Sequence, residues 1–310
     1  MKPWDNQNPL TSEQISEVIS EQFPALGLVT AHKLGEGWDN TTWRVNNEWL
    51  FRFPKHQLAA ELLHNELRLL PVLHHLPVSI PQPQFIGHPT DTILYSFYGH
   101  KFLQGETAEC YQLTHAERSK LAKPLAEFLK ALHAFPVSQA LEMGVKHDQR
   151  DRMNVGIRFN KTTEHLSYLA EHGVIPSIHP WFDFFKEHQH LETPPEWVLA
   201  HGDLYAKHLL LDQANNLTGI IDWGDAEILH PAVDLALLYE FIPSEAHDDF
   251  WNIYGEVPEI TKLLAKLRAI YSSAMLAWYA HHIQDRLLLQ EALHALDYLA
   301  NCDDRTIKIN

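Results

Sequence analysis

The sequence predicts an α+β protein with two lobes, of which the first is built on a five-stranded antiparallel sheet and the second is mostly helical. The chain has 310 residues, which is long for a single core and suits two lobes. Short apolar runs between turn residues occupy the first third of the chain, which is typical of strands. From Thr114 the apolar residues recur at helical spacing instead.

The first lobe is expected to contain strands, turns and two helices. Thr11 and Gln14 have the spacing of a capping box and predict a helix that begins there. Period-2 and turn patterns predict five strands, over 28–34, 41–46, 48–53, 84–87 and 92–97. Residues 59–76 have helical periodicity, which Pro71 should kink or end.

The second lobe is expected to be helical, apart from one strand over 197–200 and one hairpin. The helical segments are 114–132, 150–170, 180–190, 231–241 and 259–310. Between Leu209 and Ile221, two short apolar runs flank a polar turn, which predicts the hairpin.

Two acidic triplets, His201-Gly202-Asp203 and Asp222-Trp223-Gly224, flank this hairpin. Because a hairpin brings its outer ends together, we expect Asp203 and His208 to lie close to Asp222. Clustered carboxylates are costly unless a cation shares the site. A magnesium–nucleotide complex would supply that cation.

The spacing of these residues is that of a kinase active site. Asp203 precedes His208 by the interval between Asp and Asn in H-R-D-x-x-x-x-N, and Asp222-Trp223-Gly224 takes the place of D-F-G. On these motifs the chain resembles the aminoglycoside phosphotransferase family of kinase-like small-molecule kinases. The branch with aminoglycoside 2''-phosphotransferases and macrolide kinases also has His in the Asn position. The resemblance implies a two-lobed protein-kinase-like fold, with lobes over 1–99 and 106–310 and a hinge over 100–105.

The resemblance also implies roles for the residues around the hairpin. Asp203 would be the catalytic residue that orients the acceptor hydroxyl, and Asp222 would bind Mg²⁺. His208 would be the second metal residue, although Mg²⁺ prefers oxygen ligands, so a contact through water or with a phosphate stays open. Asp234 would anchor the catalytic loop by accepting backbone hydrogen bonds, and His201 would be structural.

Further residues resemble the family's nucleotide site. Arg52 stands where the family has Lys, and Lys55 is the alternative cation. Glu66 falls on the apolar side of its helix and needs a partner, for which Arg52 is the obvious candidate. The predicted nucleotide residues are Gly35, Gly37, Asn40, Thr41, Arg52, Glu66, Phe102 and Leu103. The choice between ATP and GTP as donor stays open.

The net charge limits the classes of partner that the protein is expected to bind. The formal net charge of −16 argues against nucleic acid and is compatible with a cationic small molecule. The resemblance implies an aminoglycoside as the acceptor, with Asp225, Glu227 and Glu240 as the candidate residues that bind it. A macrolide or a metabolite such as choline, an amino-alcohol or a sugar is the alternative.

Further features of the sequence concern the cellular location of the protein and the rival classes of protein. Two cysteines and no apolar run of membrane-spanning length predict a cytoplasmic protein with no membrane partner, and a monomer is favoured. The segment between Asp222 and Pro231 is too short for the activation segment of a protein kinase. Arg52 and His208, which depart from the commonest kinase residues, keep a non-catalytic nucleotide-binding or ligand-binding protein as the rival.

Overall fold

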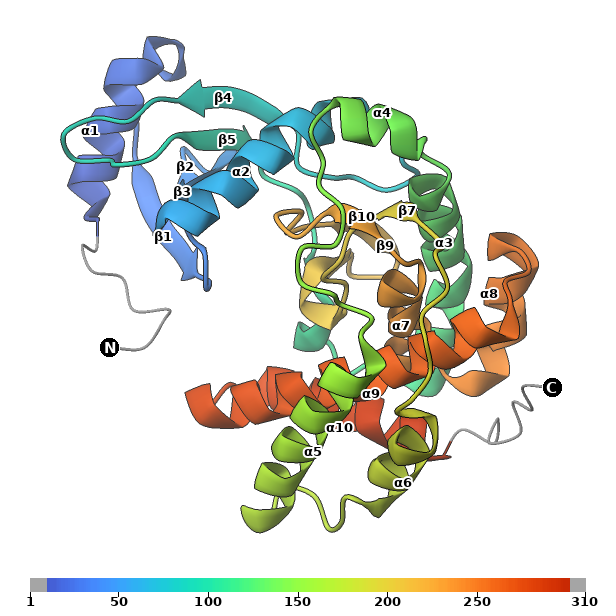
Figure 1. Ribbon diagram of the computed structural model, residues 1–310. Coiled ribbons are helices and arrows are strands. Elements are labelled where there is room, and N and C mark those ends of the chain that lie inside the picture. The colour runs from blue at the N-terminus through green and yellow to red at the C-terminus, as the bar shows by residue number, and fades with distance from the viewer. Residues whose placement is uncertain (1–9, 302–310) are drawn as a thin grey trace. The chain divides into compact units, whose positions relative to one another are not determined.

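The computed structural model describes residues 10–301, which form two compact units (Figure 1). The first unit consists of the described residues up to His75 together with Ser79–Gln104 and Trp223–Asp225. The second unit consists of Leu76–Val78, Gly105–Asp222 and the described residues from Ala226 onward. Within 10–301, no helix is both long and apolar enough to span a membrane.

The first unit contains one antiparallel sheet and two helices. The strands are paired in the order β1-β2-β3-β5-β4. The elements are α1 (Ser12–Gln22), β1 (Ala31–Glu36), β2 (Asn40–Val45), β3 (Trp49–Pro54), α2 (Gln57–Leu69), β4 (Pro83–Gly87) and β5 (Phe97–Lys101). The predicted five-stranded antiparallel sheet is therefore confirmed.

Apolar side chains from one face of the sheet form the core under α1. Phe51 and Phe53 of β3 are buried against Phe97, while Ile15 and Ile19 of α1 cover the same cluster. Burial of each such side chain stabilises the fold by roughly 1.5–3 kcal/mol. The predicted capping box of α1 is present, with Thr11 and Gln14 bonded to each other's backbone amides.

The fifth strand was predicted over 92–97, and this was wrong. The strand β5 runs from Phe97 to Lys101, so it includes Gly99 and the first two residues of the predicted hinge. Gly99 suggests a turn in the sequence, but here the close approach of an aromatic ring requires it: a Cβ at this position would lie 2.5 Å from Cζ of Phe51. By contrast, the effect of Pro71 is confirmed, because α2 ends at Leu69 and a 3₁₀ turn follows.

The second unit is mostly helical, as predicted, with short strands. Its helices are α3 (His115–His133), α4 (Val137–Glu142), α5 (Val155–Glu171), α6 (His179–His188), α7 (Ala232–Phe241), α8 (His247–Tyr254), α9 (Glu259–Ile283) and α10 (Arg286–Asn301). Its strands are β6 (Glu106–Thr107), β7 (Val198–Ala200), β8 (Leu209–Leu211), β9 (Leu217–Ile220) and β10 (Glu227–Leu229).

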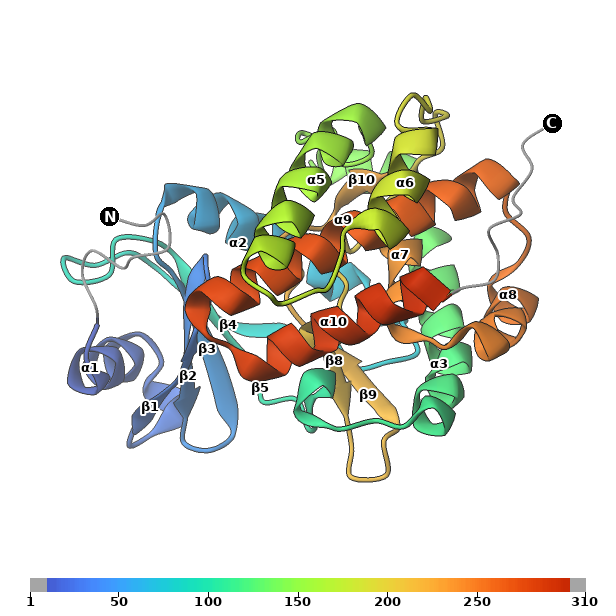
Figure 2. The same ribbon diagram turned by 90° about the horizontal axis from the view of Figure 1, so that it is seen from below.

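The second unit contains the predicted hairpin and the helices that pack in its core. The predicted hairpin is present, since β8 and β9 pair antiparallel with Leu209 opposite Ile220. Every residue of α7 is buried, and α9 packs against both α7 and α10. Figure 2 shows α9 and α10 side by side. Gln284, with φ of +60°, separates these two helices, and the predicted helical tail beyond Asn301 lies outside the described residues.

Candidate active site

The hairpin brings the two predicted carboxylates to one histidine. Nδ1 of His208 lies 2.6 Å from the carbonyl oxygen of Asp203 and 3.7 Å from its Oδ2, while Nε2 lies 3.4 Å from Oδ2 of Asp222. The carboxylates are 38% and 46% exposed, respectively, whereas His208 is buried. The expected meeting of Asp203, His208 and Asp222 is therefore confirmed.

His208 carries a positive charge in this arrangement. A carbonyl oxygen can only accept, so Nδ1 must donate its proton to Asp203. Burial alone would lower the pKa of His208, but its hydrogen bond to Asp222 and the charges of both carboxylates raise it to about 9. The imidazolium thus compensates two neighbouring negative charges.

Asp234 holds the catalytic loop from α7. Its Oδ2 accepts from the amide of His201 at 2.7 Å, and its Oδ1 accepts from the amide of Gly202 at 2.8 Å. Nε2 of His133 lies 3.2 Å from Oδ2, and its Nδ1 lies 2.7 Å from the hydroxyl of Tyr254. Burial would raise the pKa of Asp234, but these donors lower it. The predicted anchoring contacts are confirmed.

His201 connects the catalytic loop to the strand before Asp222. Its Nε2 donates to the carbonyl oxygen of Ile221 at 3.1 Å, and its Nδ1 accepts from the amide of Asp203 at 3.3 Å. Only a neutral ring with its proton on Nε2 can make both of these hydrogen bonds. Consistently, burial lowers the pKa of His201 to about 4. The predicted structural role of His201 agrees with these contacts.

Asp222 has an unusual backbone conformation. Its φ is +66°, in the left-handed region that non-glycine residues rarely adopt. Such conformations persist where the surrounding structure holds them, and they concentrate at functional sites. This conformation lets the chain turn immediately after β9 while the carboxylate stays beside His208.

The site suits Mg²⁺ through oxygen ligands. The half-exposed carboxylate of Asp222 is the kind of hard ligand that Mg²⁺ prefers, usually one or two carboxylates together with substrate phosphates. Among residues 10–301, no cluster of three or more His, Cys, Asp or Glu side chains is arranged to hold a metal by itself. Because His208 uses Nδ1 for Asp203 and directs Nε2 to Asp222, it suits orientation of that carboxylate better than direct binding of Mg²⁺.

In the first unit, Arg52 and Glu66 form the expected ion pair. Nη1 of Arg52 lies 3.2 Å from Oε1 of Glu66, and both side chains are buried. The hydroxyl of Tyr98 on β5 donates to Oε2 of Glu66. Tyr98 was not predicted, because its contact with Glu66 bridges 32 residues and depends on strand β5, which was misplaced.

We expect Tyr98→Phe to weaken this buried ion pair. Without the hydroxyl, Oε2 of Glu66 loses a donor, which should lower the free energy of unfolding by about 1–3 kcal/mol. If Arg52 binds the nucleotide, KM for the nucleotide should rise several-fold, while KM for the acceptor stays unchanged. Urea unfolding and steady-state kinetics measure both effects.

Tyr95→Phe is the matched control for this variant. Within the described part of the chain, the hydroxyl of Tyr95 forms no hydrogen bond. A Tyr98→Phe protein as stable as the control would show that the hydroxyl contributes nothing to the pair.

His100 lies beside Arg52 on the same sheet and stays neutral. Its Nδ1 donates to the carbonyl oxygen of Lys101 at 2.8 Å. Burial, together with the charge of Arg52, lowers the pKa of His100 to about 4. Because an unfolded His titrates near about 6.5, the unfolded chain binds more protons between these two pH values. His100 therefore contributes stability above pH 6.5 that is lost as the pH falls toward 4.

The variant His100→Asn should reduce the acid sensitivity of the fold. Asn retains a donor for the carbonyl of Lys101 but does not titrate. Between pH 6.5 and 4.5, the free energy of unfolding should fall less steeply than in the wild type, by up to about 1.4 kcal/mol per pH unit. Urea titrations at several pH values measure the slopes, and identical slopes in both proteins would contradict a buried neutral His100.

The glycine-containing turn is held by Lys55, which the sequence offered only as an alternative phosphate ligand. Nζ of Lys55 donates to the carbonyl of Gly37 at 3.0 Å and lies 3.0 Å from Oε1 of Glu36. Its side chain is only 3% exposed. The cation of Lys55 is thus committed to the turn between β1 and β2, which leaves Arg52 as the stronger candidate for the nucleotide phosphates.

The other predicted nucleotide residues lie around this turn and after β5. Gly35 pairs with Thr42, the amide of Gly37 donates to the carbonyl of Asn40 at 2.9 Å, and Asn40 and Thr41 begin β2 as buried residues. The amide of Phe102 donates to Glu48, and its ring lies 4.5 Å from the guanidinium of Arg44. Leu103 follows in the same loop and is half-buried.

The three predicted acidic residues for the acceptor differ in their surroundings. Asp225 belongs to the first unit. Glu227 is buried on β10, with Oε2 3.7 Å from Nη2 of Arg152. Glu240 is buried in α7, and Ser272 of α9 donates to its carboxyl group. Two of the three acids are therefore engaged by other side chains of the protein.

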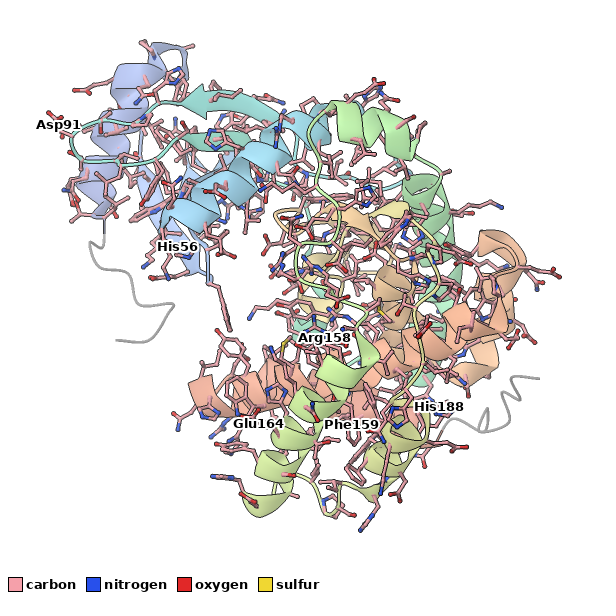
Figure 3. The ribbon with its side chains drawn as sticks, viewed as in Figure 1. His56, Asp91, Arg158, Phe159, Glu164 and His188 are labelled. Carbon is pink, nitrogen blue, oxygen red and sulfur yellow. The ribbon has the colours of Figure 1, made fainter. Side chains whose placement is uncertain are left out.

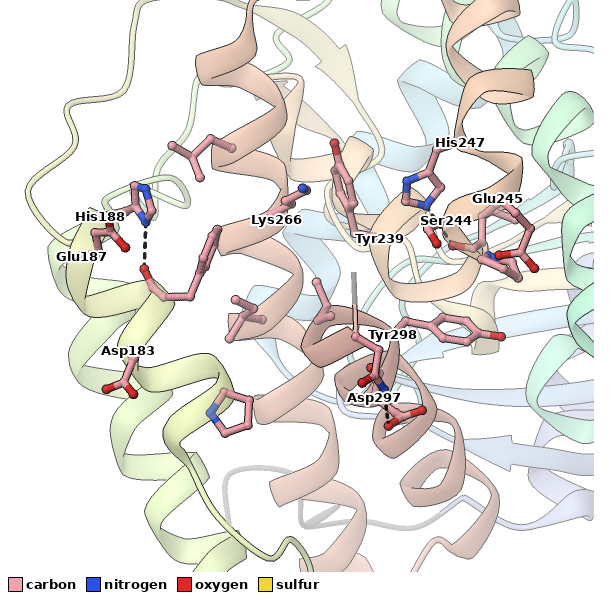
Figure 4. A pocket seen from close by; sticks show the side chains of 18 of the residues that line it. Asp183, Glu187, His188, Tyr239, Ser244, Glu245, His247, Lys266, Asp297 and Tyr298 are labelled. Atoms are coloured by element: carbon pink, nitrogen blue, oxygen red, sulfur yellow. Dashed lines mark hydrogen bonds between the residues drawn. The ribbon is translucent and has the colours of Figure 1, made fainter. Parts of the chain in front are cut away.

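A cavity of about 620 Å³ lies in the second unit, away from the residues predicted to be catalytic. Residues from α6, α7, α9 and α10 line it, and Lys266 lies beside the ring of Tyr239 (Figure 4). Nζ of Lys266 is 5.3 Å from the centre of that ring. Asp203, His208 and Asp222 are not among its lining residues.

Comparisons with known proteins identify the family. A model of the phosphotransferase enzyme family (APH) matches residues 30–270. The GDP and kanamycin complex of APH(2")-IIIa is 30% identical, has a TM-score of 0.66, and the match covers 93% of this chain and 99% of that one. Macrolide 2'-phosphotransferase type I is 21% identical with a TM-score of 0.58, over 91% of this chain and 96% of that one, and shares the fold.

A curated relative gives a shorter match. The uncharacterized protein YcbJ of Bacillus subtilis (strain 168) is 45% identical over 47 residues, which span 15% of this chain and 15% of that protein. The family match, by contrast, covers most of the chain and includes both acidic triplets. The chain therefore belongs to the phosphotransferase enzyme family and is a phosphotransferase with the kinase-like fold of that family.

Proposed function

We propose that the protein transfers the γ-phosphoryl group of a nucleoside triphosphate to a hydroxyl group of a small molecule. One observation carries the proposal: the half-exposed carboxylates of Asp203 and Asp222 both lie within 3.7 Å of the buried ring of His208. One carboxylate is thereby available to a hydroxyl group and the other to a magnesium ion, which are the two requirements of phosphoryl transfer.

The chemistry assigns a role to each side chain. The acceptor oxygen forms a bond to the γ-phosphorus, the bond from that phosphorus to the β–γ bridging oxygen breaks, and the nucleoside diphosphate leaves. Asp203 orients the hydroxyl and takes its proton, which then passes to solvent. Asp222 would hold Mg²⁺, which supplies charge stabilisation at the phosphates, while His208 orients both carboxylates.

The donor is proposed to bind the first lobe. Arg52, paired with Glu66, would be the cation for its phosphates, and Tyr98 holds that glutamate. The turn at Gly35 would offer backbone amides. The base would lie near Phe102 and Leu103, in the hinge proposed over 100–105 between lobes 1–99 and 106–310. Because the 30% identical neighbour is a GDP complex, GTP is the first donor to test, and ATP is the second.

The class of acceptor is less constrained than the reaction. An aminoglycoside is supported by the kanamycin in the neighbour and by the net charge of −16. The burial of Glu227 and Glu240 does not favour it, because neither acid is left in solvent for an ammonium group. A macrolide or a metabolite alcohol therefore belongs in the same screen.

The test is an incubation of the purified protein with Mg²⁺ and GTP or ATP. Kanamycin, erythromycin, choline and simple sugars serve as acceptors, and mass spectrometry detects a product that is heavier by one phosphoryl group. Slow release of phosphate without an acceptor measures the chemistry independently of the acceptor. Nucleotide binding without either reaction would favour the rival, a non-catalytic nucleotide-binding protein.

A further inference from the structure

Three guanidinium groups gather near the catalytic loop of the second unit. The guanidinium carbons of Arg158 and Arg268 lie 4.9 Å and 5.1 Å from the centre of the Tyr271 ring. Burial lowers the pKa of Arg268, and the positive charges of Arg152 and Arg158 lower it further. Arg158, labelled in Figure 3, belongs to the first turn of α5, and Arg268 belongs to α9.

Two of the three guanidiniums are used within the protein. Nη1 of Arg152 donates to the carbonyl oxygen of Gly202 at 2.8 Å, directly before Asp203, and its Nη2 lies near Glu227. Arg158 donates to the hydroxyl of Tyr271 at 3.3 Å and to the carbonyl oxygens of Arg150, Asp151 and Arg152. These contacts hold the segment before α5 and the catalytic loop together.

Arg268 differs from its two neighbours. Within residues 10–301 its guanidinium forms no hydrogen bond and no ion pair, and its side chain is half-buried. The nearby acid, Glu240, receives its hydrogen bond from Ser272 instead. Burial raises the pKa of Glu240 to about 7, so this carboxyl group compensates the guanidinium only in part at neutral pH. A guanidinium has five donors and stays charged, so Arg268 retains its capacity for an anion.

Arg268 is also close to the chemistry. The hydroxyl of Ser272 contacts both the carboxyl group of Glu240 and the carbonyl oxygen of Arg268, so Glu240 and Arg268 are neighbours. Arg158, which shares the ring of Tyr271 with Arg268, donates to the carbonyl oxygen of Arg152. Arg152 in turn donates to the carbonyl oxygen of Gly202, directly before Asp203. A small molecule held at Arg268 would therefore have its other functional groups near the catalytic carboxylate.

We propose that the acceptor carries an oxyanion, a carboxylate or a phosphate ester, that binds the guanidinium of Arg268 while its hydroxyl group faces Asp203. The inference rests on the phosphotransferase function proposed above and specifies its substrate class. Arg pairs with such groups through two parallel hydrogen bonds. The ammonium groups of a polycation would instead meet Arg158 and Arg268, which is a repulsive arrangement.

The kinetic test compares alcohols that differ in charge. Glycerol, glycerate and glycerol 3-phosphate form one series, panthenol and pantothenate form a pair, and kanamycin represents the polycations. We expect phosphorylation of anionic acceptors in preference to their neutral partners. Arg268→Gln should raise KM for the anionic acceptor about tenfold or more, with kcat reduced less and KM for the nucleotide unchanged. Arg286→Gln, an equal change of charge at an exposed position, is the control and should leave all three constants unchanged.

The outcomes separate the inference from the function on which it rests. Turnover of kanamycin or neutral alcohols, undisturbed by Arg268→Gln, would overturn the oxyanion site and leave the phosphotransferase function intact. Absence of phosphate release and of product with every acceptor would count against the function itself.

If no acceptor in the series reacts, binding decides the oxyanion site. Inorganic sulfate should raise the melting temperature of the wild type and of Arg286→Gln more than that of Arg268→Gln. Equal shifts in the three proteins would refute the site.

Discussion

The variant Asp203→Asn is expected to lower kcat by about 10³-fold and to leave the affinity for the nucleotide within about twofold. Asn has the shape of Asp but cannot take the hydroxyl proton, and general-base catalysis typically contributes about 10²–10⁴-fold. The contact between the backbone carbonyl of residue 203 and His208 does not depend on the side chain, so the loop should keep its conformation. Phosphate release and product formation measure kcat, and calorimetry measures nucleotide binding.

The control is Asp183→Asn, which makes the same change of charge at an exposed position of α6. It should have wild-type kinetics. Retention of full kcat by Asp203→Asn would remove this residue from the reaction, and a large loss of nucleotide affinity would place it in the donor site instead.

The variant Asp234→Asn is expected to lower the free energy of unfolding by about 3–5 kcal/mol at pH 7, because a buried acceptor of two amides and of His133 loses its charge. One half of the Asn amide is a donor and would face the N–H groups of His201 or Gly202. The catalytic loop would lose its anchor, so kcat should fall even under conditions in which the variant is folded. Urea unfolding followed by circular dichroism measures the stability.

The effect of this variant should depend on pH in a defined direction. Because the pKa of Asp234 is lowered in the folded protein, its charge stabilises the fold above about pH 4, the ordinary pKa of Asp. That contribution is lost as the pH falls below this value, so the difference between wild type and variant should shrink toward pH 3. Asp249→Asn, at an exposed position of α8, is the control, and equal stability of both variants at pH 7 would contradict the anchoring role.

Local patterns in the sequence were sufficient to predict which residues meet at the hairpin. The hairpin follows from two short apolar runs and a polar turn, and its closure makes Asp203, His208 and Asp222 neighbours. The pairing of Arg52 with Glu66 was predictable for a different reason: a carboxylate on the apolar side of a helix needs a cation. The order and spacing of these motifs also indicated the family that the comparison identified.

Other parts of the fold and site could not be predicted locally. Strand β5 was misplaced because Gly99 and His100 have no strand signal of their own, and the ring of Phe51 on β3 is what requires the glycine. Tyr98 was missed for the same reason. Likewise, the sequence does not show whether an acidic residue lies on a solvated helix face or forms a buried hydrogen bond. The contact of Ser272 with Glu240 could therefore not be predicted.

The sequence by itself therefore determined the family, the two-lobed α+β class and the three residues at the hairpin, because each depends on short-range periodicity, turn chemistry or spacing. Only the tertiary structure decided which charged groups are compensated. Arg152 reaches Gly202 across 50 residues, and Arg158 reaches Tyr271 across 113. The guanidinium of Arg268 remains without a hydrogen bond within residues 10–301. The physical reason is that the charge compensation of a side chain depends on groups that only folding brings near it, and the proposed class of acceptor depends on that compensation.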